Sequence, residues 1–147
     1  MRLPRVFVLV LVSMLLAPPA VAAPDWTKAE LVTVRMVEYH FVPDHLSFRQ
    51  GAAYHLHLQN DGTELHEFTA PEFLKAIEIG NPEVLGGYGK EIVLQPHEQK
   101  DLYFVARQPG RYKLICADHD WAGMTGEIVK IGRASCWGRV LISVVAG

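Results

Sequence analysis

Residues Tyr112–Met124 read YKLICADHDWAGM, and the last nine of them carry one thiol, one imidazole and one thioether. The three side chains belong to Cys116, His119 and Met124, in the spacing C-x2-H-x4-M. Soft thiolate and thioether donors favour copper, and two His with one Cys and a distant axial Met are typical of electron-transfer copper centres. The stretch therefore predicts such a centre, with one histidine still to come from elsewhere in the chain.

The best candidate for the missing ligand is His66, within the strand-like segment Thr63–Thr69. A Greek-key connection returns a strand about this far upstream to lie beside the strand that ends at Cys116. The histidines that compete with it are His40, His45, His55, His57 and His97.

The sequence contexts of these competitors differ from that of a buried ligand. His55 and His57 alternate with leucines on a presumed strand and are expected to face solvent, and His97 lies in a polar turn. His40 and His45 lie near the end of the first expected strand and remain alternative ligands.

Together with the lead-in Pro109–Tyr112, the ligand loop resembles the cupredoxins, the small blue copper proteins, and in particular the plastocyanin and pseudoazurin type. The resemblance extends from about Glu30 to Ile131. It implies an all-β, Greek-key β-sandwich with one mononuclear type 1 copper ion at one end, held by His66, Cys116, His119 and Met124. The chain departs from the family at Glu67, where many members have an Asn that helps to tie the two ligand loops together.

Short β-type runs separated by turn residues predict the same sandwich, with antiparallel strands. The expected strands are Leu31–Val37, Leu46–Arg49, Tyr54–Leu58, Leu65–Thr69, Glu91–Leu94, Leu102–Ala106, Arg111–Cys116 and Gly126–Ile131. One short helix is expected after the His66 strand, over Pro71–Ile77, because proline is tolerated in the first turn and apolar residues then share one face.

Strand periodicity predicts the environment of the cysteine. If Tyr112, Leu114 and Cys116 share one face of their strand and Lys113 faces solvent, the thiol lies in the core. A buried cysteine without a metal is an inert, small apolar residue, and a role in the core alone is the alternative for Met124, because methionine fills cores readily. The spacing to His119 is what favours the metal centre over these alternatives.

The first 23 residues resemble a cleaved secretory signal, with Arg2 and Arg5 before the apolar run Val6–Leu16 and small residues at Ala20–Ala23. The alternative, a transmembrane anchor, is disfavoured because the run is shorter than the roughly 20 residues that span a bilayer. We therefore expect a periplasmic or otherwise exported protein with no membrane span after cleavage. Removal of the signal changes the formal net charge from −2 to −4.

The remaining chain fits one cupredoxin domain over residues 24–131 and a tail of unknown role over 132–147. The chain has only two cysteines, and if Cys116 holds a metal, Cys136 in the tail has no disulfide partner in the chain. Scattered Lys and Arg, with no basic run, argue against nucleic-acid binding. We expect a monomer.

The function that these features predict is a one-electron carrier, not an enzyme. A copper-delivery protein could use the same ligands, but the mature chain has only Met36 and Met124 as further soft donors beyond the cysteines. An enzyme would need a second metal site or a substrate pocket, and the sequence reveals no second ligand cluster. Redox partners are expected to dock near His119 and Trp121, with Asp118 and Asp120 attracting a basic surface.

Overall fold

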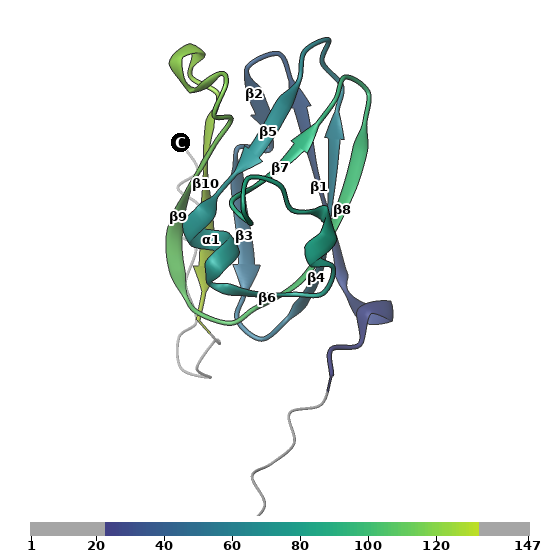
Figure 1. Ribbon diagram of the computed structural model, residues 1–147. Helices are drawn as coiled ribbons and strands as arrows, with labels where there is room; N and C mark the ends of the chain where they lie inside the picture. The colour runs from purple at the N-terminus through teal and green to yellow at the C-terminus, as the bar shows by residue number, and fades with distance from the viewer. Residues whose placement is uncertain (1–22, 133–147) are drawn as a thin grey trace, which may run out of the picture.

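Two five-stranded sheets face each other in the computed structural model, which describes residues 23–132 (Figure 1). Sheet A has the strand order β2 (His40–Val42), β1 (Glu30–Val37), β4 (Ala53–Asn60), β8 (Gln99–Ala106) and β6 (Ile77–Ile79). Sheet B has the order β3 (His45–Arg49), β10 (Thr125–Ile131), β9 (Gly110–Ile115), β5 (His66–Thr69) and β7 (Glu91–Leu94). The helical segments are η1 (Trp26–Lys28), α1 (Pro71–Lys75), η2 (Pro82–Val84) and η3 (Asp120–Ala122).

The expected all-β sandwich is confirmed. The chain passes repeatedly from one sheet to the other, so that β1 lies beside β4 and β5 beside β9, as in a Greek-key arrangement. The expectation of purely antiparallel strands is wrong, since β1 pairs with β4 and β3 with β10 in parallel. The signal peptide and the tail with Cys136 lie outside the described residues, apart from Ala23 and Gly132.

Within residues 23–132 the single short α-helix follows the His66 strand as expected, but it ends at Lys75 rather than at Ile77. Phe73 and Leu74 are buried as the helical pattern predicted. Ile77 instead begins β6 and pairs with Ala106 of β8, because a β-branched residue next to an unpaired sheet edge extends the sheet more favourably than the helix. The short strands β2 and β6 were not expected from the sequence.

An aromatic cluster joins the two sheets. Phe48 of β3 packs edge-on against Tyr54 and Phe104 of sheet A, with ring centroids 4.8 and 5.0 Å away. Phe73 of α1 stacks on the same ring at 5.7 Å. Edge-to-face geometry adds to the burial of these large apolar rings, so Phe48 links sheet A, sheet B and the helix in one core.

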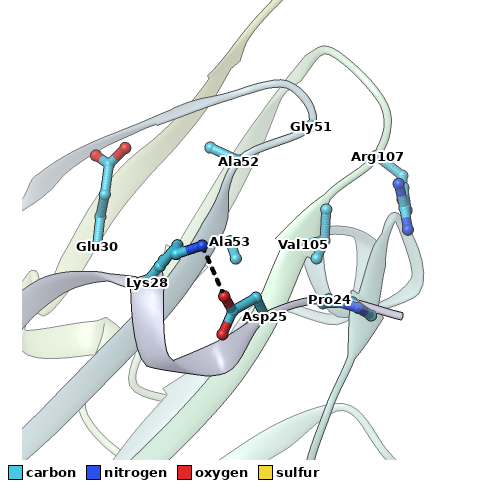
Figure 2. Close-up of a pocket in the computed structure, with 9 residues that line it drawn as sticks. All are labelled: Pro24, Asp25, Lys28, Glu30, Gly51, Ala52, Ala53, Val105 and Arg107. Carbon is cyan, nitrogen blue, oxygen red and sulfur yellow. Dashed lines mark ion pairs between the residues drawn. The ribbon is translucent and has the colours of Figure 1, made fainter. Parts of the chain in front are cut away.

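The two ends of the sandwich differ in chemistry. The loop between β9 and β10, which includes η3, and the loop between β4 and β5 lie at the same end, at the top of Figure 1. At the opposite end is a surface pocket lined by Asp25, Lys28, Glu30 and Arg107 among others, where Lys28 pairs with Asp25 at 3.1 Å (Figure 2). Neither His nor Cys lines that pocket, so the metal centre has to be sought at the other end.

We expect Gly126→Ala to lower the free energy of unfolding by about 1–3 kcal/mol, measured by urea denaturation, because it overpacks a strand junction. A β-carbon at Gly126 would lie 2.5 Å from the carbonyl oxygen of Asp44, which accepts the N–H of Glu127 where β3 meets β10. Gly86→Ala is the control, since its β-carbon would meet nothing closer than 3.7 Å. Equal stability of the two variants would contradict this account of the junction.

Candidate metal centre

The junction of β5 and β9 brings His66 to the cysteine. The two strands pair through Thr69 and Ile115, and the chain leaves β9 at Ile115. Cys116, the next residue, is fully buried, and His66 at the start of β5 is equally buried. Residues fifty positions apart are therefore neighbours inside the same end of the sandwich, as strand periodicity predicted for the thiol.

Three potential ligands converge there. Cys116 Sγ lies 3.9 Å from His66 Nδ1 and 3.4 Å from His119 Nδ1, and the two imidazole centroids are 5.0 Å apart. All three ligand atoms lie within 4.8 Å of one another. One thiol and two imidazoles at this spacing fit a soft or borderline metal ion, and copper and zinc are the ions for which such donors are usual.

The turn after β9 is closed by its own backbone. The N–H of Cys116 donates to the carbonyl of Met124 at 3.0 Å, and the N–H of His119 donates to the carbonyl of Cys116 at 3.1 Å. The N–H of Met124 in turn donates to the carbonyl of His119 at 3.2 Å. Gly123, whose φ of 88° is unfavourable for other residues, lets the chain turn back toward β10. Met124 is fully buried, and its backbone hydrogen bonds hold it next to Cys116 and His119.

A buried asparagine shapes the loop before His66. Asn60 Nδ2 lies 2.8 Å from the carbonyl oxygen of Glu64 and 3.1 Å from those of Leu94 and Gln95. Its Oδ1 accepts the N–H of Gly62. Side-chain bonds to backbone groups of this kind hold a loop that has no ladder of its own, so Asn60 fixes the approach to β5.

The orientation of His119 is set by a residue that the sequence did not single out. His119 Nε2 lies 2.9 Å from a carboxylate oxygen of Glu64. An imidazole that donates its Nε2–H to a carboxylate has its Nδ1 free as an acceptor, and that atom faces Cys116. Only proximity in the fold reveals this role, because Glu64 lies two residues before His66 in a polar loop.

The protonation properties of the cluster follow from its burial. Burial, together with the neighbouring His119, lowers the pKa of His66 and so favours the neutral imidazole that a metal requires. Burial raises the pKa of the Cys116 thiol, although N–H groups of Glu67, Asp118 and His119 act in the opposite direction. A bound cation would offset the cost of the buried thiolate.

Glu67, the residue that follows His66, connects the two segments that carry the candidate ligands. The N–H of Glu67 donates to Cys116 Sγ at 3.3 Å. Burial raises the pKa of the Glu67 carboxyl, and the negative charges of Asp118 and Glu91 act in the same direction. The backbone N–H groups of Ala117 and Asp118 act to lower it. The Glu67 side chain thus reaches the segment between Cys116 and His119.

The competing histidines lie elsewhere. His40 and His45 are exposed and contact the Glu38 carbonyl and the Asp44 carboxylate, and His97 is exposed in its turn. His55 and His57 lie on the outer face of sheet A, as predicted from their alternation with buried residues of β4, and both are partly buried there.

The same two histidines belong to a second group of potential ligands. His55 and His57 join Asp101 in a group whose ligand atoms lie within 4.8 Å of one another. The sequence revealed no such second group, whereas the fold assembles it. Asp101 lies on a different strand more than forty residues away, so sequence spacing could not reveal it.

Aromatic side chains cover the outer side of His119. Tyr39, in the turn between β1 and β2, lies 5.0 Å from the His119 ring and 6.2 Å from Trp121. Trp121 is 77% exposed, and its indole N–H donates to the carbonyl of Asp118. The sequence singled out Trp121 but not Tyr39, whose turn conformation has a positive φ of 64°.

Comparison with known families gives one match over most of the chain. A family model described as a cupredoxin-like domain matches residues 6–129. A search of curated proteins found no match.

Solved structures with the same fold include two auracyanins. Auracyanin B has 18% sequence identity and a TM-score of 0.55, with 74% of this chain and 93% of that chain covered. Dithionite-reduced auracyanin from the photosynthetic bacterium Roseiflexus castenholzii has 15% identity and a TM-score of 0.52, with 70% and 98% covered. A multi-copper oxidase from Pediococcus acidilactici has 17% identity and a TM-score of 0.55, but the match covers 69% of this chain and 25% of the oxidase. Identities this low show the fold alone.

We expect Glu64→Ala to weaken metal binding at the Cys116 centre by about tenfold, because His119 loses the acceptor that fixes its ring. Competition against a chromophoric chelator measures this affinity. Glu72→Ala, which removes an exposed carboxylate from α1, is the control and should bind like the parent protein. Unchanged affinity in Glu64→Ala would show that the carboxylate does not orient His119.

Proposed function

Because the chain belongs to the cupredoxin family, we propose that it is an exported type 1 copper protein that carries single electrons between redox partners. The observation that carries this proposal is the convergence of His66, Cys116 and His119 ligand atoms within 4.8 Å at one end of the sandwich. Copper bound there would supply the Cu(II)/Cu(I) couple.

Each ligand has a distinct part in the proposed centre. Cys116 provides the thiolate, and His66 and His119 provide neutral imidazoles through Nδ1. Met124 is the proposed axial donor, a position through which the protein adjusts the reduction potential. The hydrogen bond from Glu67 N–H to the Cys116 sulfur stabilises negative charge on that atom and so contributes to the same adjustment.

Burial of the centre supports a carrier over a delivery protein. Cys116, His66 and Met124 have no exposed surface. His66 begins β5, Cys116 directly follows β9, and Met124 directly precedes β10. Ligands held by rigid strands move little between oxidation states, which keeps the barrier to electron transfer low. A delivery protein needs a metal that incoming ligands can reach, and here the surrounding side chains block that approach.

The surface around His119 supports the proposed docking of a redox partner. Trp121 is exposed next to Tyr39, and Asp118 and Asp120 flank His119 as exposed carboxylates. An apolar platform with an acidic border favours a partner whose contact surface is apolar with basic residues around it.

Export remains part of the proposal. Its support is the signal-like sequence of residues 1–23, almost all of which precedes the described part of the chain. Within residues 23–132, no helix has the length and apolar character needed to cross a bilayer.

We expect Cu(II) to produce an intense visible thiolate-to-copper band that saturates at one equivalent, because a Cys116 thiolate donates charge directly to the metal. Cys116→Ser should abolish the band. His66→Gly should open a coordination position that added imidazole refills, as followed by visible and EPR spectra.

Two substitutions control this experiment. Cys136→Ser and His40→Gly should both leave the band unchanged, since neither residue belongs to the proposed ligand set. Loss of the band in His40→Gly with a normal spectrum in His66→Gly would contradict the ligand assignment, and a colourless Cu(II) complex of the parent protein would contradict the whole proposal.

We also expect reversible one-electron voltammetry of the copper-loaded protein without loss of metal, because the ligands are buried and held by strands. Incubation of the reduced protein with a Cu(I) chelator separates the alternatives. Slow extraction agrees with a carrier, whereas rapid transfer of Cu(I) would favour the delivery function, and turnover of a substrate would favour an enzyme.

A further inference from the structure

We propose that His55, His57 and Asp101 form a second metal site, for a divalent first-row transition ion such as Zn²⁺. The site lies on the outer face of sheet A, whereas the Cys116 centre lies inside one end of the sandwich. It rests on its own geometry and does not depend on the proposed electron-carrier function.

Two central strands of sheet A build the cluster. Tyr54, Leu56 and Leu58 of β4 are buried, so the intervening His55 and His57 project from the opposite face. Asp101 of β8 is the direct cross-strand partner of His57 in the antiparallel ladder between β4 and β8. Cross-strand partners on one face have β-carbons about 4.5–5.5 Å apart, which brings their donor atoms together.

The donor atoms converge on one point. His55 Nε2 lies 2.6 Å and His57 Nδ1 lies 2.7 Å from the same oxygen, Oδ1 of Asp101. The side chains are 27%, 23% and 44% exposed in the order His55, His57 and Asp101. The cluster is therefore sheltered by the sheet yet open on one side, which gives an ion a path from solvent.

Neighbouring residues hold two of the donors in place. The His55 ring stacks on Tyr103 with centroids 4.5 Å apart and an interplanar angle of 20°. Asn81 donates to the carbonyl of Asp101 and accepts the N–H of Tyr103, so one amide side chain fixes β8 on both sides of the site. Sites built on strands and supported in this way keep a defined geometry.

The donor set identifies the class of ion. Imidazole suits Zn²⁺, Cu²⁺, Ni²⁺ and Fe²⁺, and a carboxylate oxygen adds a harder donor that disfavours Cu(I). Two His and one carboxylate leave at least one position for water, as in three-ligand zinc sites. Partial burial acts to raise the pKa of Asp101, but the hydrogen bonds with His55 and His57 lower it overall, so these contacts favour the charged carboxylate that a metal ion would bind.

The decisive measurement is equilibrium dialysis of the purified protein against buffered Zn²⁺. The parent protein should bind one more equivalent than either His57→Gln or Asp101→Asn. His97→Gln removes an exposed imidazole from a turn and should keep the parent stoichiometry. Because only the difference between proteins is compared, zinc bound by the Cys116 centre does not affect the result.

The two sites can be tested separately. His57→Gln and Asp101→Asn should retain the visible copper band of the Cys116 centre, so failure of one site is distinguishable from failure of the other. If a variant does not fold, NMR of the parent protein replaces it, and Zn²⁺ should shift the imidazole resonances of His55 and His57 but not of His97. Equal stoichiometry in folded variants, or unshifted His55 and His57 resonances, would overturn the proposal.

Discussion

The contact between β5 and the end of β9 is the constraint on which the candidate centre depends. The N–H of Glu67 donates to the sulfur of Cys116, and the two strands pair through their last residues, Thr69 and Ile115. This contact brings together ligands from two segments that are fifty residues apart. The sulfur also satisfies the N–H of Glu67, a partly buried backbone donor that would be costly to leave without an acceptor.

Sequence patterns predicted most of the fold because the strands alternate buried and exposed residues so regularly. The expected strand Glu91–Leu94 coincides with β7, and the other expected strands differ from the observed ones by one to three residues at their ends. The parallel pairs and the short strands β2 and β6 could not be predicted. Those features depend on which edges the Greek-key connections leave open, and residue periodicity contains no such information.

The candidate site was predictable to the extent that its residues are close in sequence. Cys116, His119 and Met124 form a local pattern, and His66 was predicted because it lies in a strand-like segment at the upstream distance expected of a Greek-key return. Glu64 was not predictable, because its role depends on the position of His119 across the loops. Tyr39 was equally hidden in a turn whose path only the fold defines.

Sequence distance also explains why the second cluster, His55, His57 and Asp101, was not predicted. The two clusters are nevertheless built in a similar way. In both clusters a strand contributes histidine, and a segment distant in sequence supplies the cysteine or aspartate that decides which metal ions the site favours. Cys116 makes one site soft and closed, so that burial disfavours its free thiolate and a bound cation relieves that cost. Asp101 adds a harder oxygen donor to the second site, which is partly open to solvent. One of its carboxylate oxygens contacts both imidazoles. A single sandwich can thus present two donor sets to different ions, because ion selection follows donor chemistry and burial rather than the fold.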